Sequence, residues 1–100
     1  MTLYPMKLVT IICESFARER VLAVLNDVGA QGYTLFPTEG AGSRGTRPGD
    51  IPEFTNLQIE VIVPQTVAES LLKRLEIEFF AKFALVVYES DIRVLRPQKF

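Results

Sequence analysis

Residues 7–36 read KLVTIICESFARERVLAVLNDVGAQGYTLF, and this stretch decides the fold. Its first seven residues are rich in β-branched side chains and are too few for a helix, so they predict a strand. Ser15 then offers a hydroxyl cap for a helix whose apolar residues recur at helical spacing over residues 17–28. Gly29 stands where a left-handed C-terminal cap is expected, and β character resumes at residues 33–36. The stretch therefore predicts a helix that links two strands.

The second half of the chain repeats this order of elements. Residues 57–63 alternate in polarity and predict a strand, and Pro64 ends it. Residues 66–69 have the pattern of a capping box that opens a second helix. Residues 84–88 are apolar throughout, as expected of a strand covered on both sides, and residues 92–95 predict a last short strand. The whole order predicts an α+β fold, a ferredoxin-like βαββαβ arrangement with a short extra C-terminal strand.

Residues 40–56, between the second and third predicted strands, have a different composition. They hold Gly40, Gly42, Gly45 and Gly49, four of the six glycines, and carry no periodic apolar pattern. We expect a long mobile loop here, and loops of this length are uncommon unless they are functional. The chain thus reads as one domain over residues 1–100, with this loop and a polar tail at 96–100.

Composition and charge exclude several functions. The chain has 100 residues, 11 basic and 12 acidic side chains, no histidine and one cysteine. Its net charge of −1 lacks the basic signature of a general nucleic-acid binder. The absence of histidine excludes imidazole-based triads and nearly all histidine-ligated metal sites. One thiol, no membrane-spanning apolar run and no secretory signal lead us to expect a protein of the cytoplasm.

Some apolar side chains remain after both helix faces are used. Ile77, Phe80 and Phe83 cluster near the end of the second helix, and Ile62 points away from its apolar strand neighbours. A chain of this size would leave some of them in water. Burial between subunits is the natural remedy, so we expect an oligomer.

The long loop is also the best candidate for chemistry. Its glycines allow backbone amides to approach an anion, and Arg44 and Arg47 add donors suited to phosphate or carboxylate. No Gly-Lys-Ser/Thr sequence follows, so the loop is not a P-loop, and the spacing alone leaves anion binding and a plain surface hairpin about equally supported. The carboxylates suggest no acid–base pair, although Glu60 lies within an apolar strand. Cys13 reads as a small buried hydrophobic residue rather than a reactive thiol.

Four segments resemble the PII signalling superfamily in order and spacing: ICESF at 12–16, VGAQGYT at 28–34, EGAG at 39–42 and QIEVIVP at 58–64. The resemblance spans nearly the whole chain. It implies a ferredoxin-like homotrimer that binds adenine nucleotides in clefts between subunits and engages a target through the loop after its second strand.

Further segments are similar to one branch, the PII-like proteins associated with bicarbonate transporters (the SbtB type) and carboxysomes. These segments are residues 40–47, 79–80 and 83–88. Unlike the nitrogen-regulatory members, the loop holds no tyrosine for uridylylation. Residues 81–83 stand where those members have a Gly-rich, lysine-bearing turn, so the usual triphosphate clamp is missing. Residues 96–100 read RPQKF and do not resemble the redox tail of many SbtB-type proteins, so the resemblance does not lead us to expect redox control.

The resemblance assigns nucleotide contacts to six positions of the strands and the loop: Gly32, Thr34, Gly40, Gly42, Glu60 and Ile62. It implies that adenine lies near Glu60 and Ile62, with Thr34 supplied by a neighbouring subunit. Metal ligands and catalytic residues are not implied.

Four arginines complete this site. Arg44 and Arg47 match loop arginines that face the phosphates, and they are also the candidates for holding bicarbonate. Near the C-terminus, either Arg93 or Arg96 corresponds to a basic residue directed toward the phosphates.

The function that the resemblance implies is a non-enzymatic sensor. Its ligands would be ADP or AMP, with ATP or cyclic AMP as further candidates, together with bicarbonate and no catalytic cofactor. Its partner would be a membrane bicarbonate transporter, which would recruit it to the inner membrane, or a carboxysome-associated protein. The alternative is a metal-responsive ferredoxin-like trimer of the divalent-cation tolerance type, which one cysteine and no histidine make a poor match. A small enzyme is a third alternative, but no nucleophile–base pair supports it.

Overall fold

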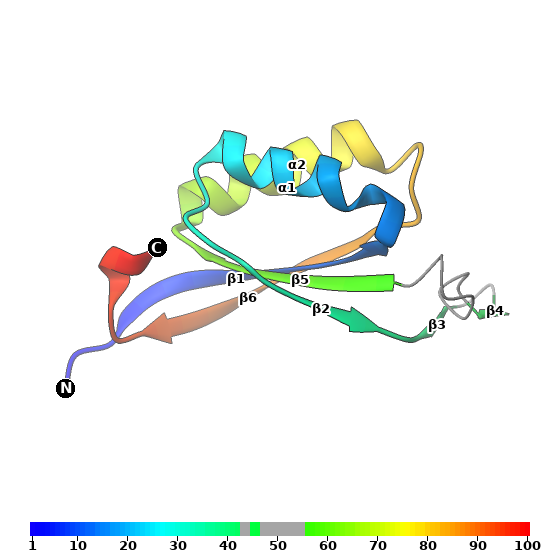
Figure 1. Cartoon of the computed structure of the whole chain (residues 1–100). Coiled ribbons are helices and arrows are strands. Elements are labelled where there is room, and N and C mark those ends of the chain that lie inside the picture. Colours follow the sequence, from blue (N-terminus) through cyan, green and yellow to red (C-terminus); the bar gives the residue numbers. More distant parts are fainter. Residues whose placement is uncertain (43–44, 47–55) are drawn as a thin grey trace.

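The computed structural model describes residues 1–42, 45–46 and 56–100. Its elements follow in this order: β1 (Tyr4–Glu14), η1 (Ser15–Ala17), α1 (Arg18–Val28), β2 (Thr34–Thr38), β3 (Ala41–Gly42), β4 (Gly45–Thr46), β5 (Asn56–Val63), α2 (Gln65–Phe79), β6 (Val86–Val94) and η4 (Pro97–Lys99). Four strands form one antiparallel sheet in the order β2-β5-β1-β6. Both helices cover the same face of this sheet (Figure 1). The predicted ferredoxin-like fold is confirmed.

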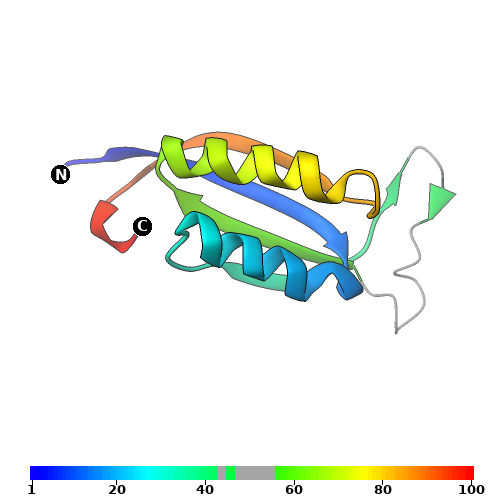
Figure 2. The same cartoon turned by 90° about the horizontal axis from the view of Figure 1, so that it is seen from above.

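The core lies between this sheet and the two helices, which run side by side above it (Figure 2). Alternate residues of the central strands point into the core: Val9, Ile11 and Cys13 from β1, and Leu57, Ile59, Val61 and Val63 from β5. The helices contribute Val21, Val24, Leu25, Ala68, Leu71, Leu75 and Phe79. Cys13 is fully buried, as its apolar setting predicts.

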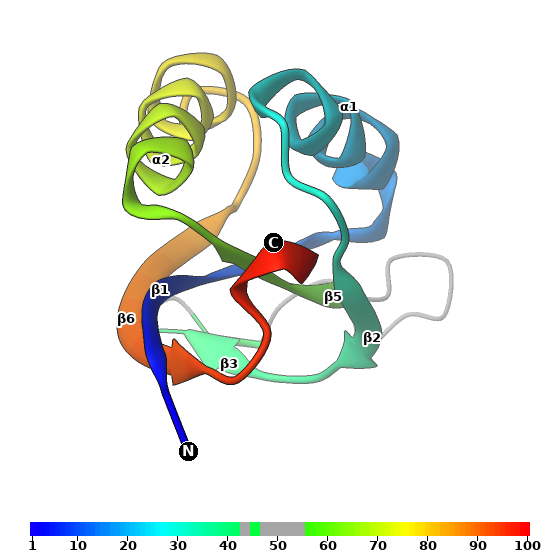
Figure 3. The same ribbon diagram turned by 90° about the vertical axis from the view of Figure 1, so that its left-hand side faces the viewer.

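The other face of the sheet, called the open face here, carries no helix among the described residues (Figure 3). Its side chains are the alternate set of the same strands. In β1 and β5 these residues are only partly covered, except Thr10, Glu14 and Asn56, which are buried. On the outer strands Phe36 is 37% exposed, Val86 45% and Tyr88 49%. An apolar surface of this kind on a small domain is typical of an interface.

The helix ends differ in part from those predicted. Gly29 has a φ of 88°, so the left-handed cap of α1 is confirmed. The predictions of a side-chain cap for each helix are wrong. Ser15 lies in η1 and does not cap α1, and α2 begins at Gln65 without a side-chain cap. The Gln65 amide donates to Glu69 within the first turn instead, at 3.2 Å.

The C-terminal region also departs from the prediction. Residues 84–88 and 92–95 were expected in separate strands, but β6 is one continuous strand. It is an edge strand, and each of its residues is exposed or only partly buried, so it is not covered on both faces within one chain. Its polar middle is tolerated because Lys7 pairs across the strands with Glu89 and Asp91. Beyond β6 the tail forms the short helix η4.

The loop contains more secondary structure than expected. β3 and β4 form a small hairpin in which Ala41 pairs with Thr46. Asn56 was assigned to the loop but belongs to β5 and is buried. The rest of the predicted loop, residues 43–44 and 47–55, lies outside the described residues.

Candidate functional site

Three of the predicted nucleotide contacts lie together on the open face. Thr34 of β2 is directly opposite Glu60 of β5, and Thr10 of β1 is opposite Glu60 on its other side. Glu60 is half-buried and accepts a hydrogen bond from the Gln58 amide at 3.2 Å. Ile62 lies two residues further along β5, on the same face and also half-buried. A carboxylate with an apolar neighbour therefore faces out of the sheet beside an exposed threonine.

The predicted glycines lie at opposite ends of β2. Gly32 precedes the strand and Gly40 follows it, and both are exposed. A Cβ at either position would meet no heavy atom within 4 Å, so the chain itself leaves open space there. Gly42 ends β3 and is opposite Gly45 in the hairpin. Arg44 and Arg47 lie outside the described residues.

The C-terminal arginines lie far from the loop within one chain. Because β6 is antiparallel to β1, it ends at the opposite end of the sheet from the β3–β4 hairpin (Figure 1). β6 is also the edge strand opposite β2. Arg93 is on β6, and Arg96 directly precedes η4. A single chain therefore does not bring Arg93 or Arg96 together with Gly40 and Gly42.

Arg93 lines a surface cavity of about 620 Å³ between the start of α2 and the β1–β6 pair. Lys7 and Asp91, which are ion-paired, form part of its wall. The hydrogen bond to Asp91, with the nearby charges of Glu89 and Glu69, raises the pKa of Lys7. Lys7 is thus neutralised by its partner. Arg93, the other cation in this wall, has no ion pair to a described residue.

A second ion-pair network joins the helices. Arg74 of α2 lies 3.1 Å from Asp27 of α1 and 2.6 Å from Glu78 one turn further along α2. The hydrogen bonds from Arg74 lower the pKa of Glu78 and raise that of Arg74 itself. All three side chains are partly exposed, so this network belongs to the surface of the helix layer.

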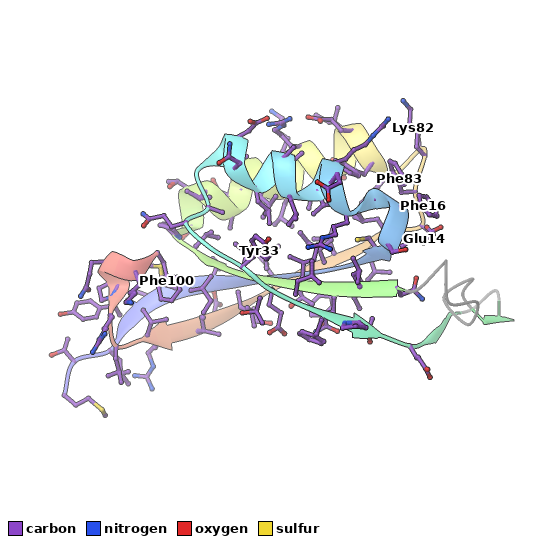
Figure 4. The ribbon with its side chains drawn as sticks, in the orientation of Figure 1. Glu14, Phe16, Tyr33, Lys82, Phe83 and Phe100 are labelled. Atoms are coloured by element: carbon purple, nitrogen blue, oxygen red, sulfur yellow. The ribbon has the colours of Figure 1, made fainter. Side chains whose placement is uncertain are left out.

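Sequence reasoning missed two buried polar residues at the loop end of the sheet. Glu14 ends β1 and is 8% exposed, and its carboxylate accepts a hydrogen bond from the backbone N–H of Ala84 at 2.9 Å. Asn56, opposite Glu14 in β5, is 1% exposed. Figure 4 shows Glu14 close to Phe16 and Phe83 at this end of the molecule. The only signal in the sequence was the position of Glu14 inside the segment 12–16 that carries the family resemblance.

Two other features bear on the classes of function considered above. Within residues 1–42, 45–46 and 56–100, no group of three or more acidic, cysteine or histidine side chains is placed to hold a metal ion. No helix in that part of the chain is long and apolar enough to cross a membrane.

Comparison with known proteins identifies the family. Residues 6–99 match the family described as nitrogen regulatory protein P-II. A PII-like signaling protein from Thermus thermophilus is 41% identical, with a TM-score of 0.85 over 100% of this chain and 99% of that one. CPII, a nitrogen regulatory PII-like protein from Thiomonas intermedia, is 33% identical in a structure bound to ADP, AMP and bicarbonate. That structure has a TM-score of 0.90 over 99% of this chain and 96% of CPII.

A further structure of CPII, bound to ADP and bicarbonate, is 34% identical with a TM-score of 0.89, and it covers 99% of this chain and 97% of CPII. The match to the family covers all four segments on which the resemblance was based. The chain therefore belongs to the P-II family, a family of regulatory signalling proteins.

Proposed function

We propose that this chain is a PII-like sensor that binds ADP or AMP in clefts between the subunits of a homotrimer, responds to bicarbonate and acts on a partner through its loop. The observation that carries the proposal is the placement of the half-buried Glu60 carboxylate, held by Gln58, beside the apolar Ile62 on the open face. It is supported by the ADP, AMP and bicarbonate bound to CPII.

The chemistry of these side chains suits an adenine base. Adenine has an exocyclic amino donor, and the half-buried Glu60 carboxylate is an acceptor. Ile62 offers apolar surface to the ring. Gln58 already holds one oxygen of Glu60, which fixes the orientation of the carboxylate. In the proposed cleft, the neighbouring subunit supplies its own Thr34 beside this base.

The phosphates would lie at the loop end, near Gly40 and Gly42. Arg44 and Arg47 would face them, and a guanidinium suits both a phosphate and a planar bicarbonate. Arg93 or Arg96 would come from a second subunit. The separation of these arginines from Gly40 within one chain supports a site built by two chains (Figure 1).

We further propose that the partner is a bicarbonate transporter or a carboxysome-associated protein, and that docking on a transporter would bring the protein to the inner membrane. This step rests on the resemblance of residues 40–47, 79–80 and 83–88 to the SbtB-type branch. The same resemblance suggests that ATP binds little more tightly than ADP, because residues 81–83 replace the turn that holds the outer phosphates.

Calorimetric titration tests the proposal. AMP, ADP, ATP and cyclic AMP are titrated with and without bicarbonate, and ATP with and without magnesium. We expect ADP or AMP to bind at least as well as magnesium-bound ATP, and bicarbonate to strengthen binding. Binding of no adenine nucleotide would contradict the proposed function. Nucleotide binding that is unaffected by bicarbonate would contradict only the carbon-sensing part.

A further inference from the structure

Glu14 makes a contact between distant parts of the chain. Its carboxylate Oε1 accepts a hydrogen bond of 2.9 Å from the N–H of Ala84, 70 residues later. Ala84 lies in the segment between α2 and β6, residues 80–85, called the connection below. Glu14 is 8% exposed, and no ion pair joins it to any described residue. A buried carboxylate without a cation is costly, so its position calls for a specific role.

The side chain of Glu14 takes the place of a backbone hydrogen-bond partner at the end of the β1–β6 pair. In the β1–β6 ladder Ile12 pairs with Val86, so the same register would place Glu14 opposite Ala84. The ladder ends before that pair because β6 starts at Val86. The Ala84 N–H bonds to the Glu14 side chain instead, which allows the connection to leave the sheet and still remain attached to β1.

The rest of the connection is attached to the helices. The N–H groups of Lys82 and Phe83 both donate to the carbonyl of Phe79, at 3.0 and 2.9 Å. The Phe83 ring lies 5.5 Å from the Phe79 ring and 5.9 Å from the Phe16 ring, measured between centroids. Phe83 and its neighbours hold the connection on the helix side, and the hydrogen bond from Ala84 to the Glu14 carboxylate attaches it on the sheet side (Figure 4).

Glu14 also lies beside the strand ends that bound the loop. Asn56, the first residue of β5, is opposite Glu14 on one side and Thr38, the last residue of β2, on the other. The Asn56 Oδ1 atom is buried and has no hydrogen-bond partner among the residues that the structure describes. Unsatisfied buried polar atoms are rare in native proteins and are tolerated most often at functional sites. The row Thr38–Asn56–Glu14–Ala84 thus joins both ends of the loop to the connection.

We propose that Glu14 is a positioning residue of the nucleotide site. By holding Ala84, it sets the connection at a fixed place beside the base of the loop, so that the phosphate end of a bound nucleotide meets both segments together. This inference rests on the proposed function, because it assumes that the phosphates lie at the loop end of the sheet. The carboxylate acts through its position as an acceptor and not through its charge.

Three substitutions of Glu14 separate position from charge. Glu14→Ala removes the acceptor, and Glu14→Asp keeps the charge but withdraws the oxygen by one methylene. Glu14→Gln keeps an oxygen that can accept from Ala84 and removes the charge. Glu76→Ala is the matched control, because Glu76 is an exposed carboxylate of α2. Should Glu14→Ala not fold, Glu14→Asp carries the test.

The first measurement is amide hydrogen exchange at Ala84 without ligand. Exchange should be about tenfold faster in Glu14→Ala and Glu14→Asp, the effect of losing one hydrogen bond. Exchange in Glu14→Gln and Glu76→Ala should stay close to that of the natural protein. Slow exchange at Ala84 in all four variants would overturn the inference.

The second measurement is the ratio of the dissociation constants of AMP and ADP, with adenosine as a reference. We expect Glu14→Ala and Glu14→Asp to reduce several-fold the gain in affinity from AMP to ADP, without changing the affinity for adenosine. Glu14→Gln should keep the gain of the natural protein. If the ratio of the AMP and ADP dissociation constants were unchanged in these variants, or if adenosine and ADP lost affinity equally, the proposed role of Glu14 would be wrong. The proposed function would not be affected by either result. A natural protein that binds neither nucleotide would instead overturn the proposed function, and the role of Glu14 with it.

Discussion

Tyr88 provides the most direct test of whether the open face is covered in the assembled protein. It lies on the edge strand β6 and is 49% exposed in one chain. Tyr88→Thr removes the ring and keeps a residue that suits a strand. An aromatic side chain hides roughly 200 Å² when fully buried. At roughly 25 cal/mol per Å², covering the 49% that is still exposed contributes about 2.5 kcal/mol per chain.

In a trimer this loss occurs three times, about 7 kcal/mol in total. That corresponds to about five powers of ten in the constant for dissociation into three chains. Size-exclusion chromatography with light scattering over a range of protein concentrations measures the effect. The natural protein should have about three times the 11.3 kDa mass of one chain, and Tyr88→Thr should approach the mass of one chain on dilution.

Ile77→Gln is the matched control. Ile77 is 69% exposed on α2, in the helix layer, on the far side of the sheet from the open face. The sequence alone suggested that it is buried between subunits, but this position leads us to expect it outside an interface formed by the open face. It should keep the trimeric mass. Dissociation of Ile77→Gln with an intact Tyr88→Thr trimer would show that the helix layer forms the interface, and the reasoning from the open face would be wrong. A natural protein of single-chain mass at every concentration would remove the basis for a site between subunits.

Three more outcomes are expected. Arg44→Ala should weaken ADP binding in calorimetry by about tenfold to a hundredfold, the loss of one charge-assisted contact; unchanged affinity would remove Arg44 from the site. Backbone amides of residues 40–48 should exchange more slowly with nucleotide and bicarbonate than without them, because an anion held by arginines offsets the entropy of ordering a glycine-rich segment; equal exchange would contradict the sensor mechanism. Glu78→Gln should lower the melting temperature more at pH 7 than at acidic pH. The lowered pKa of Glu78 means that its pairing with Arg74 stabilises the fold fully above the unfolded pKa of 4.5, and that this stabilisation is lost as the pH falls through the folded value. An equal difference at both pH values would exclude this pairing as the cause.

The fold could be predicted from the sequence because its main signals are local. The alternation in residues 57–63 and the helical spacing in residues 17–28 each depend on which side chains face the core, and the structure buries those side chains. Gly29 is a further local signal, since its left-handed conformation ends α1 without reference to the rest of the fold. The caps predicted at Ser15 and residues 66–69 failed because η1 comes between Ser15 and the start of α1, and because α2 already begins at Gln65, before Thr66.

The candidate site could be predicted only in part. Glu60 stood out because a carboxylate within an apolar strand is unusual, and the structure places it opposite Thr34. Glu14 did not stand out, because its burial depends on Ala84 and on the return of the chain beside β1. The join of two predicted strands into β6 had the same origin: its polar middle is stabilised by Lys7, far away in sequence. Contacts of this kind become visible only in three dimensions.

The arrangement of the proposed site links nucleotide binding to assembly. Gly40 and Gly42 lie at one end of the sheet, and Arg93 and Arg96 at the other end, on the opposite edge (Figure 1). If arginines from that end bind the phosphates, no single chain holds a complete site. A ligand that binds only where two chains meet must then stabilise the trimer, by an amount that grows with ligand concentration over its dissociation constant. By the same linkage, a change on the open face that loosens the trimer must weaken nucleotide binding although it touches no ligand. Tyr88, within β6, and Arg96, beyond its end, would then act on a single equilibrium.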